Sequence, residues 1–359
     1  MVAESVLREY ETRLAAVLPF PGHGAALLPH VAVEGYNAQL RRQGRYVGDE
    51  AARRVFVDRI DAWRATVRKS GKDPFGDTPS AELSKKTLDK TLRDGDSATA
   101  GIIQSAVEDF AQALVDVIRL FHARAWNGVR QVVVGGGFRA SRVGELAIGR
   151  AQLLLQDRGI DVTLHPIRHD PDEAGLIGAA YLLPPWTFAG FDALLAVDIG
   201  GTNVRAGLVR LGKHRDERGP RIARRLLWRH GDGTPTREDV VEELIAMLRK
   251  LVAYAARQKL RVAPFIGVGC PGRVRLDGRI EQGTGNLPGN WQARRFHLPT
   301  LLQRGLPQVD GAATCVILHN DAVVQGLSAL PDMAGATRWA VLTIGTGLGN
   351  AQFLNRGAS

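Results

Sequence analysis

The feature that most constrains the fold is the stretch from Leu194 to Arg210, LLAVDIGGTNVRAGLVR, in the middle of the chain. Leu194–Val197 is an apolar run that predicts a buried strand, and Arg205–Val209 predicts a returning strand. Between them, Asp198 precedes a glycine turn at Gly200–Thr202. Glycines let a backbone approach an anion and aim its N–H groups at it, so the stretch predicts a phosphate-binding hairpin. An ordinary hairpin with a Gly-Gly turn remains the alternative.

Three further stretches run from an apolar strand into a short polar or glycine turn. They are Val341–Asn350 (VLTIGTGLGN), Cys315–Gln325 (CVILHNDAVVQ) and Val132–Ser141 (VVVGGGFRAS). Together with DIGGTNVRAG, these stretches resemble the motifs of the ROK family, a sugar-kinase branch of the actin/hexokinase fold. The resemblance covers most of residues 98–183 and 194–356. It implies an α/β protein with an actin-like (ribonuclease H-like) ATPase fold and two domains around a nucleotide cleft.

The resemblance also implies a role for each motif. DIGGTNVRAG is similar to the first phosphate motif, TIGTGLG to the second, HNDA to the catalytic segment and VGGGFRAS to the adenosine segment. Asp321 would then be the base near the sugar hydroxyl, and Asp198 would hold Mg²⁺ directly or through water. The residues implied at the nucleotide are Gly200, Gly201, Thr202, Gly345, Thr346 and Gly347 for the phosphates, and Gly135, Gly136 and Gly137 for adenosine. The competing interpretation of Asp321 is a helix N-cap before Ala322–Leu330.

The order of the motifs departs from the family. A usual member begins at the DIGGT hairpin and ends with the GGG segment and a helix, whereas here the GGG segment comes first. We interpret this order as a circular permutation, which chains tolerate when the old termini are close and the new ones are exposed. The expected division is a C-terminal-type domain over residues 1–183, a linker over 184–190, and an N-terminal-type domain over 191–359 with both phosphate motifs and the catalytic aspartate. A fusion of half a kinase to another protein is the alternative.

The sugar site is the least complete part of the resemblance. Its implied ligands are Asn286, in a loop NLPGNW that resembles the family's sugar loop, together with Asn320, Asp321 and, by a loose alignment, His23. The family's E-x-G-H motif has its nearest match at residues 20–23, where Phe20 replaces the glutamate. We therefore expect glucose to be a poor substrate, because a hydroxyl would lose its acceptor. The family's cysteine-rich zinc segment is missing, so no zinc is expected, and some members that lack it use polyphosphate as donor.

Composition bounds the class of protein. With 359 residues, 45% hydrophobic and 23% charged, the chain can form two soluble domains. Its 2 cysteines suggest no disulfide framework and no zinc site, which fits a cytoplasmic protein. No run is long and apolar enough to predict a membrane span or a leader. The net charge of +10 attracts polyanions, but the arginines are scattered, and a solvated basic surface explains it better than nucleic-acid binding does.

Local patterns predict the main elements. We expect helices over residues 4–18, 98–121, 143–156 and 237–256, the last beginning at Thr236 with Asp239 in a capping box. We expect strands over 131–134, 162–167, 221–229 and 265–269, and a strand within HVAVEG at 30–35. The segment GKDPFGDTPS at 71–80 is a Pro/Gly loop that is either a lid or a surface excursion.

The function expected from this sequence is ATP-dependent phosphorylation of a sugar hydroxyl. The expected ligands are ATP with Mg²⁺, polyphosphate being a possible donor, and a small-molecule sugar, and the expected assembly is a homodimer. Two alternatives stay open: a non-catalytic sugar-sensing or regulatory protein, and a nucleotide-binding pseudokinase. The regulatory branch of the family carries an N-terminal helix-turn-helix, and residues 1–60 show no such three-helix pattern.

Overall fold

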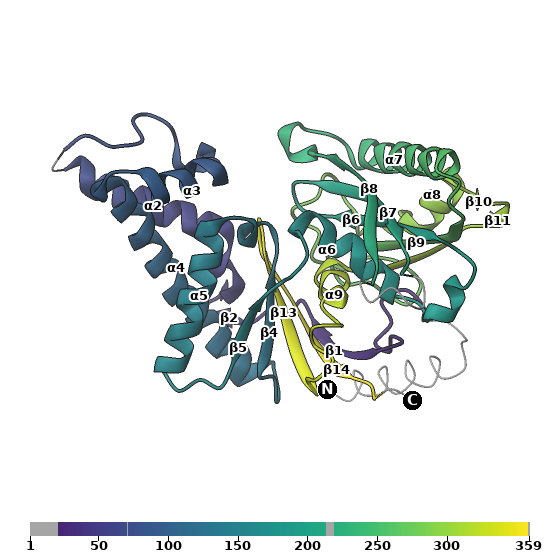
Figure 1. Ribbon diagram of the computed structural model, residues 1–359, viewed down its shortest axis with the longest axis horizontal. Coiled ribbons are helices and arrows are strands. Elements are labelled where there is room, and N and C mark those ends of the chain that lie inside the picture. The colour runs from purple at the N-terminus through teal and green to yellow at the C-terminus, as the bar shows by residue number, and fades with distance from the viewer. Residues whose placement is uncertain (1–20, 70, 213–218, 358–359) are drawn as a thin grey trace. The chain divides into compact units, whose positions relative to one another are not determined.

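The computed structural model describes residues 21–69, 71–212 and 219–357 (Figure 1). The expected helix at 4–18 and Phe20 lie outside the described residues. The chain forms two compact units. Unit 1 comprises residues 1–37, 172–337 and 351–359, and unit 2 comprises residues 38–171 and 338–350. Both units combine helices with β-sheet, so the protein is a mixed α/β protein.

Unit 1 is built on a five-stranded sheet in the order β12-β9-β6-β7-β8. These strands are β12 (Cys315–Asn320), β9 (Val262–Cys270), β6 (Ala193–Ile199), β7 (Val204–Arg210) and β8 (Arg221–Trp228). The first three are parallel, and β7 and β8 continue the sheet antiparallel to their neighbours. The β6–β7 pair is the expected hairpin, so this part of the sequence prediction is confirmed.

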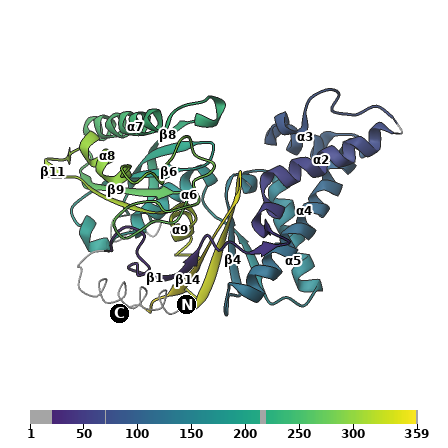
Figure 2. The same ribbon diagram turned by 180° about the vertical axis from the view of Figure 1, so that it is seen from behind.

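The strand β6 is buried on both faces, and alternate residues serve different helices. Ala193, Leu195 and Val197 belong to a core cluster with α7 (Arg237–Arg257) and α8 (Leu298–Gly305), which cover one face (Figure 2). The opposite face carries α6 (Pro171–Gly178) and α9 (Asp321–Leu327). There two sheet glycines make room, because a Cβ on Gly207 would lie 2.8 Å from Leu176 of α6 and one on Gly267 would lie 2.7 Å from Ala179 in the 3-10 turn that follows.

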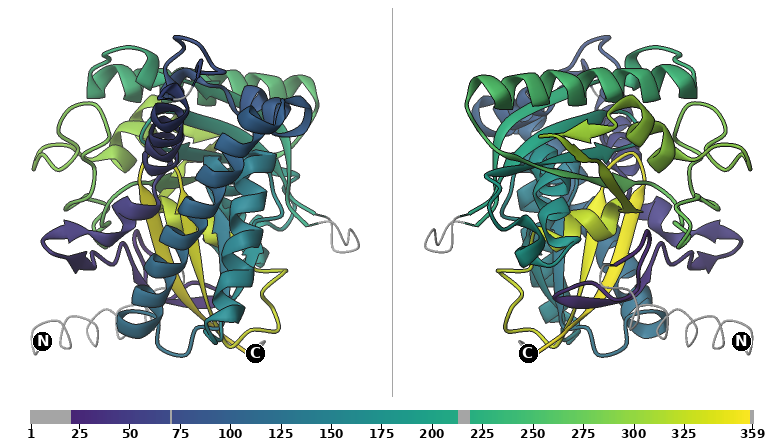
Figure 3. Two further views of the ribbon diagram at one scale, coloured as in Figure 1. Left: turned by 90° about the vertical axis from the view of Figure 1, so that its left-hand side faces the viewer. Right: turned by 90° about the vertical axis from the view of Figure 1, so that its right-hand side faces the viewer.

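Unit 2 packs its helices on the parallel strands β13 (Arg338–Ile344), β4 (Gln131–Gly135) and β5 (Thr163–Pro166). The helices are α2 (Arg53–Arg68), α3 (Lys85–Asp94), α4 (Ser97–Arg124) and α5 (Arg142–Asp157). The long α4 and α5 lie side by side in Figures 1 and 3. The strand β14 (Leu348–Asn355) runs from unit 2 into unit 1, where it pairs antiparallel with β1 (Val31–Tyr36). Short two-residue strands are β2 (Arg41–Arg42), β3 (Arg45–Tyr46), β10 (Gln308–Val309) and β11 (Ala312–Ala313).

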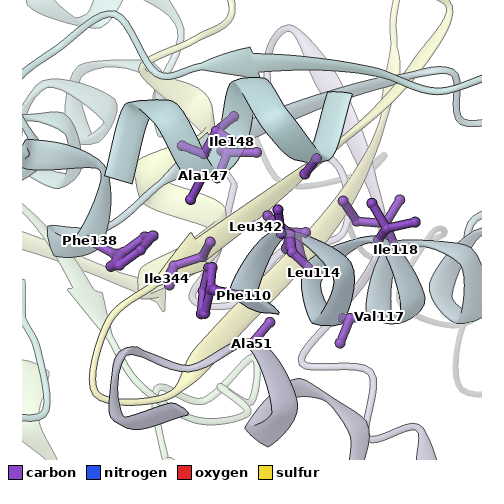
Figure 4. Packing of buried hydrophobic residues seen from close by; sticks show 14 of the residues in the cluster. Ala51, Phe110, Leu114, Val117, Ile118, Phe138, Ala147, Ile148, Leu342 and Ile344 are labelled. Carbon is purple, nitrogen blue, oxygen red and sulfur yellow. The ribbon is translucent and has the colours of Figure 1, made fainter. Parts of the chain in front are cut away.

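The core of unit 2 joins distant parts of the sequence. Phe110 of α4 lies 4.6 Å, centroid to centroid, from Phe138, which follows the three glycines after β4. Ile344 at the end of β13 belongs to the same buried cluster, as Figure 4 shows. Aromatic rings at this separation add to the burial energy and hold the glycine segment against α4.

A buried arginine holds the loop at 71–80 in place. Arg64 of α2 is 1% exposed and donates to Asp73, to the carbonyl oxygen of Gly76 and to the carbonyl oxygen of Thr78, at 2.9, 3.0 and 2.8 Å. A buried guanidinium must satisfy its donors, and here the loop supplies all of these acceptors. The contacts describe a pinned surface excursion rather than a lid.

The local predictions correspond closely to the structure. The helices expected at 98–121, 143–156 and 237–256 are α4, α5 and α7, and the capping box of Thr236 and Asp239 is present. The helix expected at 322–330 begins one residue earlier and ends at Leu327. The strands expected at 131–134, 162–167, 221–229 and 265–269, and the one within HVAVEG, are β4, β5, β8, β9 and β1.

The two compact units differ from the expected domains of residues 1–183 and 191–359. Both phosphate motifs were expected in one domain with Asp321, but Gly345–Gly347 lies in unit 2 and Gly200–Thr202 lies in unit 1. The reason is that β13 pairs with β4, which carries the GGG segment, and not with the sheet of unit 1. The segment at 184–190 contains a short 3-10 turn, Pro185–Phe188, within unit 1.

Candidate active site

The carboxyl ends of three parallel strands in unit 1 bring two carboxylates together. Asp198 of β6 is in register with Gly269 of β9, and His319 of β12 is in register with the same glycine. A Cβ on Gly269 would lie 3.6 Å from Asp198 Oδ1 and 3.5 Å from Asp321 Cα. Polar groups of parallel sheets gather at this end, where ligands of open α/β sheets bind.

Asp321 is the first residue of α9, and it does not cap the helix. The N-cap is Asn320, whose Oδ1 accepts from the N–H groups of Ala322 and Val323 at 3.0 and 3.3 Å. Burial and, to a smaller extent, the neighbouring Asp198 raise the pKa of Asp321 to about 7, although hydrogen bonds from Ala322 and Asn320 oppose the shift. A carboxyl group with a pKa near 7 is suited to accept a proton at neutral pH.

Asn320 has no capacity left for a sugar hydroxyl. Its Nδ2 donates to the carbonyl oxygen of Gly272 at 3.1 Å and to Asp321 Oδ1 at 3.0 Å, while its Oδ1 caps α9. The side chain is fully buried. The expectation of Asn320 as a sugar ligand therefore needs correction: it positions Asp321 and the start of α9.

The Gly200–Thr202 turn closes on itself. The N–H of Gly200 donates to Asn203 O at 2.8 Å, and His230 Nε2 contacts the carbonyl oxygen of Gly200 at 2.9 Å. Gly200 therefore shapes the turn and does not offer its own N–H to an anion. Next to the turn lies the exposed Asn286, since a Cβ on Gly201 would be 3.0 Å from Asn286 Cβ.

The loop that carries Asn286 is anchored as its sequence suggested. Trp291 is 1% exposed and its Nε1 donates to Pro288 O at 2.7 Å. Phe296 lies against the indole with ring centroids 5.2 Å apart. A buried indole with its N–H satisfied fixes the loop, so Asn286 is held beside the first glycine turn.

Asp198 shares an arginine with a second carboxylate. Its Oδ2 accepts from Arg205 Nη1 at 3.0 Å, and Arg205 Nη2 also contacts Asp172 Oδ1 at 2.6 Å. Burial raises the pKa of Asp198, and the Arg205 guanidinium opposes that shift. Among the residues that the structure describes, no three His, Cys, Asp or Glu side chains are grouped so as to hold a metal ion.

His23 lies against the edge of the sheet. Its Nδ1 accepts from the backbone N–H of Leu318 at 3.1 Å, and Gly24 N donates to Leu318 O at 2.9 Å. Burial and, to a smaller extent, the nearby His297 lower the pKa of His23 to about 4. The ring is therefore neutral at pH 7, with Nδ1 occupied and Nε2 carrying the proton. The ring covers the edge strand β12 at Leu318, and Leu318 is three residues before Asp321 in the sequence.

In unit 2 the other two glycine segments lie side by side. Gly136 has φ +85°, and a Cβ there would be 2.5 Å from both the N and the O of Ile344. Gly345 closes its turn through an N–H bond to Gly347 O at 2.9 Å, while its carbonyl oxygen accepts from Arg53 N at 3.1 Å. The two segments are some two hundred residues apart in the chain and lie in contact within unit 2.

A small pocket lies beside these two segments. Its wall includes Arg53 and Lys85 with the hydroxyl-bearing Ser80 and Ser141. A Cβ on Gly137 would be 3.8 Å from Lys85 Nζ. The cationic side chains belong to a segment in which the sequence pattern suggested no site.

Sequence reasoning missed three residues of unit 1. Arg205 was assigned only to a strand, although it lies directly opposite Asp198 in the β6–β7 register. Gly175 was given no role, and a Cβ there would lie 2.7 Å from Asp198 Oδ1. Gly269 separates the two carboxylates. The hairpin spacing could have revealed Arg205, because a two-strand register fixes which residues oppose each other.

No model of a known protein family and no curated protein matches this chain. Solved structures that it resembles include sugar kinases. The ROK hexokinase from Thermus thermophilus is 24% identical over 44% of this chain and 45% of its own, with a TM-score of 0.31. The ROK family glucokinase from Streptomyces griseus, in complex with glucose and AMPPNP, is 25% identical over 46% and 47%, with a TM-score of 0.33.

A third is the inorganic polyphosphate/ATP-glucomannokinase from Arthrobacter sp. strain KM, 26% identical over 45% of this chain and 58% of its own, with a TM-score of 0.33. The chain thus spans about half the length of the kinases that it resembles. Within the ranges that the structure describes, no helix is both long enough and apolar enough to span a bilayer.

Proposed function

We propose that this chain phosphorylates a hydroxyl group of a sugar with ATP as donor, and that Asp321 is the general base. The observation that supports this most directly is the environment of the Asp321 carboxyl group. It is partly buried, it has a pKa of about 7, and it does not cap α9, because Asn320 does so. Its Oδ1 accepts a hydrogen bond from Asn320 Nδ2, which fixes the carboxyl group. A fixed base of this pKa can take the hydroxyl proton as the phosphoryl group is transferred.

Each unit carries glycine turns that we propose as contacts for the donor. In unit 1 these are Gly201 and Thr202, since the N–H of Gly200 closes its own turn. In unit 2 Gly345–Gly347 would bind phosphates and Gly135–Gly137 would lie at adenosine, with Gly136 contributing shape. ATP is the proposed donor, and inorganic polyphosphate is a second donor to test. Nothing in the composition of these turns selects between them, because both donors present the same phosphate oxygens.

The residues around Asp198 do not fit a directly bound Mg²⁺. Its Oδ2 is bonded to Arg205 and its Oδ1 faces Gly175 of α6. Mg²⁺ demands near-ideal octahedral geometry and commonly keeps several waters while bridging substrate phosphates. Mg²⁺ would therefore be held by the phosphates of the donor and by water, without a ligand from Asp198.

The acceptor is proposed to meet Asp321 and Asn286. Asn286 is exposed and held by the Trp291 anchor, and it offers both a donor and an acceptor. His23 could add only its Nε2, because its Nδ1 accepts from Leu318. Few paired polar groups at an acceptor site predict weak discrimination among sugars.

The order of the motifs is proposed to be a circular permutation. Two segments far apart in the sequence meet in unit 1: Arg356 N donates to His30 O at 2.9 Å, and Asn355 pairs with Val31. A rewired chain that starts at Asp192, continues from Gly357 through a short glycine linker to Gly22, and ends at Trp186 should fold and bind ATP like the parent. Circular dichroism and calorimetric titration measure this, and a rewired chain that does not fold would contradict the permutation.

A sugar panel tests the proposed activity. Purified protein is incubated with ATP or polyphosphate, Mg²⁺ and each of a set of hexoses and amino sugars, and release of ADP and formation of sugar phosphate are measured. At least one sugar should be phosphorylated. Binding of a sugar without turnover would instead identify a sensor, and binding of ATP alone would identify a pseudokinase.

A further inference from the structure

Arg205 is the centre of a buried ionic cluster that the proposed chemistry has not used. Its guanidinium lies between two carboxylates: Nη1 contacts Asp198 Oδ2 at 3.0 Å, Nη2 contacts Asp172 Oδ1 at 2.6 Å, and Nε contacts the same Asp172 oxygen at 2.9 Å. The side chains of Arg205 and Asp198 are 12% and 9% exposed. A guanidinium stays protonated throughout the accessible pH range, so Arg205 keeps its positive charge whatever the state of the two carboxyl groups.

Asp198 is enclosed on its remaining side. A Cβ on Gly175 would lie 2.7 Å from Oδ1, and one on Gly269 would lie 3.6 Å from it. A buried carboxylate needs a counter-charge, because desolvating an unpaired ion is costly. Arg205 provides that charge, so Asp198 does not require a metal ion.

Arg205 is also next to the first glycine turn. Its Nη1 lies 3.6 Å from the position that a Cβ on Gly200 would occupy. The three bonds to carboxylates use three of the five N–H groups of a guanidinium, which leaves two. Gly200 uses its own N–H within the turn, and Arg205 brings a charged donor next to it.

We propose that Arg205 is the cationic contact for the phosphate chain of the donor at the Gly200–Thr202 turn, and that Asp198 and Asp172 are positioning residues that hold the guanidinium there. The proposal rests on the proposed function only in taking the ligand to be a phosphate chain. It replaces a metal ligand at Asp198 with an arginine anchor. Guanidinium groups suit phosphate oxygens because they donate in a planar fork.

Binding of sodium tripolyphosphate in the presence of EDTA separates the two roles. Calorimetric titration should show that the parent protein binds it without any divalent cation, and that Arg205→Gln binds it roughly tenfold or more weakly, the loss typical of a charged hydrogen bond. Arg205→Lys, which keeps the charge but cannot bridge two carboxylates, should fall between them. Arg224→Gln is the matched control, because that arginine of β8 stacks on Tyr254, at 4.8 Å from its ring centroid, and should leave binding unchanged.

Asp198→Asn and Asp172→Asn test the positioning roles. Each should weaken tripolyphosphate binding by the same factor in EDTA and in excess Mg²⁺, because the anchor and not a metal site is lost. A loss for Asp198→Asn that appears only with Mg²⁺ would overturn the inference and restore the metal ligand. Thermal melting of each variant checks the fold, and Asp172→Asn, at a half-exposed position, carries the test if Asp198→Asn does not fold.

Failure of the inference can be told from failure of the proposed function. Equal binding by the parent and Arg205→Gln, with sugar phosphorylation intact in the parent, contradicts only the role of Arg205. A parent protein that binds neither tripolyphosphate nor ATP contradicts both. Tight metal-free binding without any sugar phosphorylation supports Arg205 and contradicts the kinase.

Discussion

The Gly200–Thr202 turn of unit 1 lies beside a buried ion pair, whereas the Gly345–Gly347 turn of unit 2 is fixed by backbone contacts and has the cations Arg53 and Lys85 in the wall of the neighbouring pocket. Near the first turn lie Asp198 and Arg205, at a sheet end that also holds the partly buried Asp321. Near the second, Ile344 packs against Gly136, and Arg53 contributes its backbone N–H.

The two turns are similar in sequence, so the difference comes from their neighbours. Buried ion pairs are expensive to form and persist where geometry is well satisfied. Glycine packing costs only conformational entropy and gives a precise backbone shape. We infer that the charged residues around the unit 1 turn contribute to catalysis, whereas glycine packing at the unit 2 turn fixes the shape of the backbone. The following experiments test this difference.

The largest expected effect is on turnover. Asp321→Asn should lower the rate of sugar phosphorylation by roughly two to four orders of magnitude, which is what the loss of a general base costs. Nucleotide affinity should stay near the parental value, because Asp321 is not among the residues proposed to contact the phosphates of the nucleotide. A coupled ADP assay and calorimetric titration of ATP measure the two quantities. Near-parental turnover would show that Asp321 is not the base.

The second effect is on the stability of unit 2. Gly136→Ala should lower the free energy of unfolding by roughly 1–3 kcal/mol or more, because its φ of +85° is strained for alanine and the methyl would press on the backbone of Ile344. Urea unfolding measures the loss. The matched control is Gly149→Ala in the exposed middle of α5, where nothing lies within 4 Å, and it should gain roughly 0.5–1 kcal/mol. Equal stability of Gly136→Ala and the parent protein would show that the unit 2 turn does not depend on the backbone conformation of Gly136.

The third effect is on pH dependence. With a pKa of about 7 in the folded protein against the ordinary 3.8 of an aspartate side chain, Asp321 binds more protons when folded. The free energy of unfolding should therefore fall as pH rises from about 4 to about 7 through this group, and kcat/KM should rise over the upper part of that range as the base loses its proton. Asp321→Asn should flatten the stability profile and be the more stable protein at pH 8. Identical stability profiles would mean that the carboxyl group is not desolvated.

Much of the fold follows from local sequence. The helices at 97–124, 142–157 and 237–257 come from apolar spacing and from caps such as Thr236 with Asp239, which act over a few residues. The β6–β7 hairpin comes from two apolar runs and a glycine turn. These signals are contained in the segments that they shape, so one sequence suffices to predict them.

Tertiary structure alone decided which groups meet at the candidate site. Arg205 reaches Asp172, which is 33 residues earlier in the chain, only because α6 lies over that part of the sheet. Asn320 and not Asp321 became the cap of α9, and the Gly345 turn joined unit 2 because β13 pairs with β4. Strand order and helix placement depend on the burial of whole faces, whose free energy is summed over many residues. No local sequence pattern contains this summed free energy of burial. The partners of Asp198 and the raised pKa of Asp321 therefore appear only when the chain is folded.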